Sequence, residues 1–358
     1  MGTIANLTNT TAEFINRITD LDIRITITTS MLSIIGACVI FLSFALKWNN
    51  SETDRELMTF LVCLTIADLF IAVGYLTGAI RFIEADDIDS MPTRVLACHQ
   101  GKDPGCITQS FITTMFSMCS FFWTTLIAFN LWLPYVVTPS TDHNNIFRFP
   151  GINKKTIMFY HAISWGIPAV ITFAALCKNA LGSDMSVGSG AWCWISACLA
   201  NTERTIWMTV SGKGWEILMY FMCCGFYILL KVFKWKQQKR DKRGYLDPIS
   251  VNKVIIQRPN EDIRFLLLWL LELSLRISGT IRFIMATLRR HTGYSSGYYD
   301  KVDIILLHIQ SFGDSAQALC SCVLFCILRS NTLHFAKDII NRLRSKNEER
   351  TELLNDPN

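Results

Sequence analysis

The sequence contains few charged residues for its length, and it contains none at all between Asp103 and Asp142. Charged residues make up 18% of the 358 residues, whereas a soluble domain carries about 25%. The deficit is concentrated in long apolar segments. This distribution argues against a string of soluble domains and favours one membrane domain with short ends.

Signatures of catalysis and of metal binding are missing as well. No Gly-rich phosphate loop and no nucleophile elbow is present, and only His161 and His308 fall within apolar segments. No group of His, Asp and Glu has the spacing of metal ligands. A basic patch with interleaved aromatic residues is also absent. We therefore expect no enzymatic activity, no metal, no cofactor and no nucleic-acid partner.

Seven long apolar segments dominate the chain. Each is near or above the roughly 20 residues that cross a hydrocarbon core as a helix, and lipid offers no other partners for backbone polar groups. The segments are 25–46, 57–80, 106–137, 156–176, 205–230, 265–288 and 302–328. The sequence thus predicts an all-α membrane protein, a seven-transmembrane helix bundle over residues 25–328. A short N-terminus (1–24) precedes it and a tail (329–358) follows.

Lysine and arginine are distributed unevenly between the two sets of loops. The set comprising 47–56, 138–155, 231–264 and the tail carries 21 of them, against 10 for the other set. Cytoplasmic loops are enriched in these residues, so the N-terminus is predicted to lie outside the cell, at the plasma membrane. The basic loop 231–264 is either a solvated flank or a docking surface for a cytoplasmic partner.

The N-terminal 24 residues are polar, so we expect no cleaved signal peptide and a first span that acts as its own signal-anchor. Asn6 and Asn9 begin N-glycosylation sequons on this outer end, which is consistent with a glycoprotein. A third sequon begins at Asn49, on the predicted inner side.

Five of the thirteen cysteines lie on or near the predicted outer face: Cys98, Cys106, Cys177, Cys193 and Cys198. That face is oxidising, so disulfides can persist there. Because five is an odd number, at least one of these thiols is expected to remain unpaired.

Apolar residues recur at spacings of three and four in the tail, at Leu333, Ala336, Ile340 and Leu343, with basic residues between them. This pattern predicts an amphipathic eighth helix that lies on the inner membrane surface.

A compact set of eight ionisable residues lies within the predicted spans. Such groups usually face the bundle interior or a water-filled cavity. Lys213, Glu216, Arg282 and His308 lie in the outer half and, with Trp215, form a candidate ligand pocket; Asp68, Glu272, Arg276 and Asp314 lie deeper and form a candidate switch network. The alternative for both sets is structural ion pairing between helices.

Six short motifs occur in the order expected for a known family. They are 64–69 (LTIADL), 120–124 (SFFWT), 165–168 (WGIP), 192–194 (WCW), 212–216 (GKGWE) and 275–283 (LRISGTIRF). The first resembles the second-span motif shared among G-protein-coupled receptors, and the next three resemble the tryptophan signature of secretin-like receptors. Together they most resemble the orphan G-protein-coupled receptor 157 group, akin to slime-mould cyclic-AMP receptors, over about residues 57–330.

The resemblance implies a cell-surface receptor that transmits the signal of an unknown extracellular ligand to a heterotrimeric G protein. It also implies a disulfide between Cys106 and Cys193. The third span lacks an Asp-Arg-Tyr triplet and the seventh lacks Asn-Pro-x-x-Tyr, so rhodopsin-like switch residues cannot be transferred. The N-terminus contains no cysteine, which favours a small ligand in the bundle over a large peptide hormone.

Two other classes of function remain open from the sequence. An ion-coupled transporter would use the same buried charges and would carry a substrate without a G protein. A membrane scaffold would need no pocket at all.

Overall fold

The computed structural model describes residues 18–47, 52–86, 103–133, 154–183, 190–241, 259–292 and 297–324. Within them the chain is almost entirely helical, which confirms the all-α prediction for this part of the chain. The elements are α2 (Asp20–Lys47), α3 (Glu52–Asp86), α5 (Pro104–Trp132), α7 (Lys154–Cys177), β1 (Leu181–Gly182), β2 (Trp194–Ile195), α8 (Asn201–Met208), η1 (Thr209–Lys213), α9 (Gly214–Asp241), α11 (Pro259–Thr292), α12 (Gly297–Ser315) and α13 (Gln317–Cys322).

Five stretches are long and apolar enough to cross a membrane: Asp20–Ala45, Thr59–Ile83, Pro104–Asn130, Lys154–Cys177 and Asn201–Lys236. They coincide with the first five apolar segments of the sequence. α11 is 34 residues long, but Glu272, Arg276 and Arg282 interrupt its apolar character. The sixth and seventh crossings and the outer position of the N-terminus stay predictions, and the predicted eighth helix lies outside the described residues.

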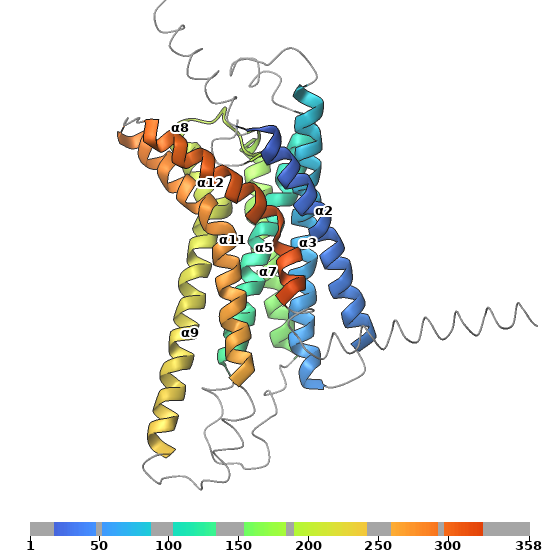
Figure 1. The fold of residues 1–358 in the computed structure, drawn as a ribbon, viewed down its shortest axis with the longest axis vertical. Helices are drawn as coiled ribbons and strands as arrows, with labels where there is room; N and C mark the ends of the chain where they lie inside the picture. Colours follow the sequence, from blue (N-terminus) through green and yellow to red (C-terminus); the bar gives the residue numbers. More distant parts are fainter. Residues whose placement is uncertain are drawn as a thin grey trace, which may run out of the picture.

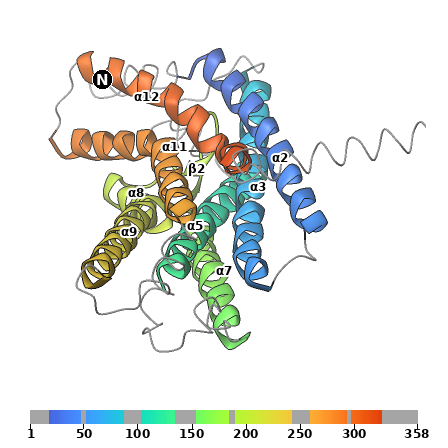
Figure 2. The same cartoon turned by 60° about the horizontal axis from the view of Figure 1, so that its bottom comes forward.

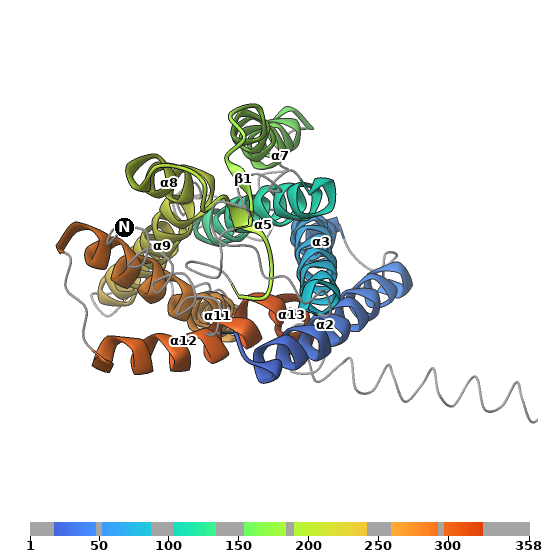
Figure 3. The ribbon, with the colours of Figure 1, turned by 90° about the horizontal axis from the view of Figure 1, so that it is seen from above.

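The long helices stand side by side, and α5 lies in the middle of the bundle (Figure 1, Figure 3). It contacts α3, α7, α9 and α11 as well as both strands. α11 in turn packs against α9 and α12 (Figure 2). This central position explains why Pro104–Trp132 has no charged residue: a helix surrounded by other helices has no face on which a charged side chain could reach water.

The segment between α8 and α9 is a π-helix, η1, which ends at Lys213. A π-helical turn is wider than an α-helical turn, and such turns are frequent at functional sites. The indole nitrogen of Trp215 donates to the carbonyl of Val210, five residues back, at 2.8 Å. Lys213 is the last residue of this turn and Glu216 follows it, and both side chains are buried.

The last described helical segment is broken between α12 (Gly297–Ser315) and α13 (Gln317–Cys322). The hydroxyl of Ser33 in α2 donates to the carbonyl of Ser315 at 2.6 Å and accepts from the amide of Leu319 at 3.3 Å. A continuous α-helix would join those two backbone groups to each other, so one side chain satisfies both at the break. Gly36 allows the close approach, because a Cβ there would lie 3.0 Å from the Ala318 carbonyl oxygen.

Trp123 is the centre of the largest core cluster, where α3, α5 and α7 meet. It is fully buried, and its ring lies 5.1 Å from His161, 5.8 Å from Phe60 and 6.0 Å from Trp165, measured between centroids. Trp123 and Trp165 come from two of the motifs identified in the sequence. Those motifs therefore describe the packing of α5 against α7.

Replacing Trp123 with alanine should destabilise the bundle by about 3–5 kcal/mol, because the cavity left in this core cannot be filled by its neighbours. The measurement is the melting temperature of the purified protein in detergent. Phe221→Ala in α9 is the matched control, since that side chain is 73% exposed and its loss should change the melting temperature little. Equal effects of the two substitutions would contradict this account of the core.

Candidate functional site

The connection between α7 and α8 folds over one end of the bundle, which we call the strand end (Figure 3). β1 and β2 pair antiparallel there, with Leu181 opposite Ile195. A disulfide joins Cys193, the residue before β2, to Cys106 in the first turn of α5, with Cα atoms 5.6 Å apart. Gln109 accepts a hydrogen bond from the Cys193 amide at 2.8 Å. The connection is thus tied to the start of α5, as the sequence resemblance implies.

A polar cavity lies beneath this connection. Its volume is about 50 Å³, which is room for only a few water molecules. It is lined by Tyr75, Thr113, Thr114, Ser117, Phe121, Trp192, Trp194, Ser211, Gly212, Lys213, Glu216, Arg276, Gln310 and Asp314. Aromatic rings and charged groups from helices far apart in the sequence therefore share one small space.

Lys213 and Glu216 form the best-satisfied ion pair of the cavity wall. The Lys213 ammonium donates to Glu216 Oε2 at 2.8 Å. The hydroxyl of Tyr220 donates to Glu216 Oε1 at 2.9 Å, and the hydroxyl of Thr280 donates to the same oxygen. Both carboxylate oxygens therefore have partners, which offsets much of the cost of burying this charge.

Arg276 is 3% exposed and much less completely paired. Its guanidinium carbon lies 4.6 Å from the centroid of the Phe121 ring, a cation–π contact. Its Nε is 3.9 Å from Glu272 Oε2, which is beyond hydrogen-bonding distance. Its Nε and Nη2 and the Glu272 Oε1 have no hydrogen-bond partner. The guanidinium therefore retains unused donors.

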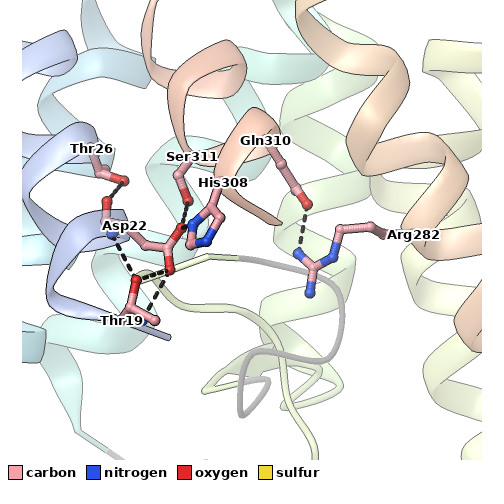
Figure 4. Close-up of polar contacts among 7 residues, drawn as sticks. All are labelled: Thr19, Asp22, Thr26, Arg282, His308, Gln310 and Ser311. Carbon is pink, nitrogen blue, oxygen red and sulfur yellow. Dashed lines mark hydrogen bonds and ion pairs between the residues drawn. The ribbon is translucent and has the colours of Figure 1, made fainter. Parts of the chain in front are cut away.

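Asp314 receives one hydrogen bond, from the side-chain amide of Gln310 to its Oδ2 at 2.9 Å. Its Oδ1 has no partner. Gln310 in turn accepts from Arg282 Nη1 at 2.7 Å (Figure 4), and Arg282 Nε donates to Asp303 at 2.9 Å. Gly279 leaves room for this row of side chains, since a Cβ there would lie 2.9 Å from the Gln310 amide nitrogen.

Asp68 lies in the interior of α3 and accepts a hydrogen bond from Ser120 in α5 at 2.9 Å. Its second oxygen has no hydrogen-bond partner. Asp68 does not line the cavity. Within the described residues, no group of three or more His, Cys, Asp and Glu side chains is arranged to hold a metal ion.

A separate polar cluster joins the start of α2 to α12 (Figure 4). Asp22 is fully buried and accepts from the amide and hydroxyl of Thr19 at 3.0 and 2.8 Å. In return, the Asp22 amide donates to the Thr19 hydroxyl oxygen at 3.4 Å, so the pair forms a capping box. The other oxygen of Asp22 lies 2.5 Å from His308 Nδ1 and accepts from Ser311 at 3.4 Å.

The structure groups the predicted site residues differently from the sequence analysis, which grouped them by their depth along the spans. Lys213 and Glu216 line the cavity together with Arg276 and Asp314, which the sequence assigned to a deeper network. Arg282 and His308 are not among the lining residues, because they pair with Asp303 and Asp22.

Trp215 is also outside the cavity. Its ring packs on Phe122, with the centroids 5.1 Å apart. Asp22 and Asp303 were missed by the sequence analysis, although the Thr-x-x-Asp spacing before the first span was a usable signal for a helix start.

The remaining predictions concern the other outer cysteines and the N-glycosylation sequons. Cys198 is disulfide-bonded, whereas Cys177 is free and exposed. Cys98 and the sequons at Asn6 and Asn9 lie outside the described residues.

The apolar helices and the polar cavity under a disulfide-tied connection define a multi-pass membrane protein with the architecture of a receptor. The chain belongs to the Frizzled/Smoothened family, whose membrane region matches residues 16–256. This result places the chain among membrane receptors of this type.

Individual relatives agree with the resemblance seen in the motifs. The chain is 29% identical to G-protein coupled receptor 157 of Mus musculus, over 83% of this chain and 78% of that protein. It is 27% identical to the Homo sapiens protein of the same name, over 83% and 77%. It is 23% identical to cyclic AMP receptor-like protein C of Dictyostelium discoideum, over 55% of this chain and 48% of that protein.

Replacing Cys106 with serine should release the connection between α7 and α8 and lower the amount of folded protein at the cell surface. Closing a long loop with a disulfide typically contributes about 2–4 kcal/mol. Flow cytometry with an epitope tag is the measurement, and Cys177→Ser, which removes a free cysteine, is the matched control. Normal surface levels of the Cys106 variant would contradict the assignment of a stabilising role.

Replacing Asp22 with asparagine should destabilise the bundle by about 1–3 kcal/mol, because the amide cannot accept from Thr19 and His308 as the carboxylate does. Asp20→Asn, which lies between the two residues of the capping box but has an exposed side chain, should have a much smaller effect. Melting temperatures of the two variants in detergent test this expectation. Similar melting temperatures for both variants would show that the link between α2 and α12 does not stabilise the bundle.

Proposed function

We propose that the chain is a plasma-membrane receptor that activates a heterotrimeric G protein when a small extracellular molecule enters the cavity. In this proposal seven helices cross the membrane, the N-terminus is outside, and the strand end faces the extracellular medium. The observation that carries the proposal is the cavity itself: a small polar space beneath a disulfide-tied connection, with incompletely paired charges from α11 and α12 in its wall.

Incomplete pairing suits a switch. A buried charge without hydrogen bonds is costly, so small helix shifts that improve its pairing change the free energy substantially. Arg276, Asp314, Glu272 and Asp68 each retain an unpartnered atom, and they come from α11, α12 and α3. A ligand that pairs with some of them in one arrangement stabilises that arrangement, which is the requirement for a ligand-driven change.

The relatives named "G-protein coupled receptor 157" support coupling to a G protein through that printed name. The predicted inner contact surface comprises the loops 138–155 and 231–264 and the inner ends of the third and sixth spans; most of the two loops lies outside the described residues. The described end of α9 carries Lys231, Lys234, Lys236 and Lys239, and Lys239 lies 4.6 Å from the Trp235 ring. This arrangement is typical of a helix that leaves the membrane on its cytoplasmic side.

An ion-coupled transporter is the alternative use of the same buried charges. It predicts substrate flux that is independent of any G protein. The family relationship does not favour it, because the relatives carry receptor names.

The test is constitutive G-protein activation in cells that express the chain, measured with a panel of Gα subtypes. Arg276→Gln at matched surface expression should change the basal signal several-fold, since it removes the cation that faces Glu272 and the cavity. Arg289→Gln is the control, because Arg289 pairs with Asp300 at 3.0 Å and does not line the cavity. Subtype-selective activation that only the Arg276 variant alters would support the proposal; equal signals from all three proteins would refute it.

A further inference from the structure

The cavity wall presents two opposite charges that do not satisfy each other. Arg276 has unpartnered donors at Nε and Nη2, and Asp314 has an unpartnered acceptor at Oδ1. Both residues line the cavity, and both are more than nine-tenths buried. By contrast, the other two charged residues in the wall, Lys213 and Glu216, are paired with each other at 2.8 Å. Two groups in the wall therefore lack hydrogen-bond partners: the donor edge of Arg276 and one acceptor oxygen of Asp314.

We infer that the cavity binds a small zwitterion, whose carboxylate pairs with Arg276 and whose ammonium group pairs with Asp314. This inference rests on the receptor function proposed above and names its ligand class. An amino acid with a short side chain is the simplest molecule of this chemistry.

The geometry of Arg276 favours a carboxylate as its partner. Nε and Nη2 lie on one edge of the guanidinium group, and this edge binds two oxygens of a planar carboxylate at once. Glu272 approaches the same edge to only 3.9 Å. A ligand carboxylate would therefore compete with Glu272 for Arg276, and binding would alter this ion pair within α11.

The rest of the wall matches the other parts of such a ligand. An ammonium group near Asp314 Oδ1 would also lie among aromatic rings, and Tyr75, Phe121 and Trp192 line the same space. Aromatic faces attract cations. A cavity of about 50 Å³ leaves little room for a side chain, which argues against large ligands unless the wall moves.

Loss of either charge on the ligand should be costly. A ligand without its ammonium group would leave Asp314 buried without a charged partner. A ligand without its carboxylate would leave Arg276 in the same state. Sites built in this way reject analogues that lack one polar group far more strongly than a hydrophobic pocket rejects a missing methylene. We expect binding at least tenfold weaker for either analogue.

The experiment uses the full chain, purified in lipid nanodiscs. Its melting temperature is measured with glycine, with the common L-amino acids and with γ-aminobutyrate, each over a series of tenfold dilutions. Every compound is paired with its N-acetyl and its carboxamide derivative. We expect at least one free amino acid to raise the melting temperature in a saturable way, with both derivatives at least tenfold weaker. This comparison needs no variant, so it does not depend on whether a variant folds.

Two variants locate the site. Asp314→Asn and Arg276→Gln should each abolish the shift, and Arg289→Gln should retain it. No shift with any free amino acid, equal shifts with the derivatives, or retained shifts in both cavity variants would each overturn the inference. The readout is binding alone, so a chain that activates G proteins but binds no zwitterion refutes only the ligand class, and a chain that binds one without activating any G protein refutes only the proposed coupling.

Discussion

Buried charge is the constraint on which the interior of this bundle depends. Among the described residues, the region around the cavity holds the acids Asp68, Glu216, Glu272 and Asp314 together with the cations Lys213 and Arg276, and Arg282 joins them through Gln310. Ions are not removed from water without compensation, so neutral donors are placed beside the carboxylates, from Ser120, Tyr220, Thr280 and Gln310. These donors and acceptors belong to α3, α5, α9, α11 and α12. The polar interior thus connects five helices whose outer surfaces are apolar.

Departures from regular α-helix occur where members of this cluster enter the cavity. Lys213 is the last residue of η1, and Asp314 lies one residue before the end of α12. Each departure exposes backbone groups that need partners, and Ser33 supplies both at the break after α12. Irregular backbone within a helical bundle is tolerated only where other groups satisfy it. Its presence beside the cavity indicates that the positions of these two charges are maintained at some structural cost.

The sequence was sufficient to predict the long described helices and the identity of most buried charges. Long apolar segments leave helices as the only solution in lipid, and ionisable residues within them are rare enough to stand out. The grouping of those charges was not predictable, because depth along a span ignores the reach and direction of a side chain. Arg276 extends to the cavity that Lys213 lines, whereas Arg282 turns to Asp303. Trp215 is rotated by about 100° from Glu216 on the helix and packs on Phe122 instead. Asp22 was missed because it precedes the apolar segment and resembled part of a polar terminus.

The unequal satisfaction of the charges separates structural from responsive elements. Glu216 has partners on both carboxylate oxygens, so any movement of its neighbours loses hydrogen bonds, and the pair with Lys213 resists change. Arg276, Asp314, Glu272 and Asp68 each keep an atom without a partner, so some movements of α3, α11 or α12 would gain hydrogen bonds for them. Two arrangements of similar free energy are possible only where gains can offset losses in this way. In the proposed receptor, the Lys213–Glu216 pair is therefore the fixed side of the cavity, and the residues on α11 and α12 form the side that responds to an occupant.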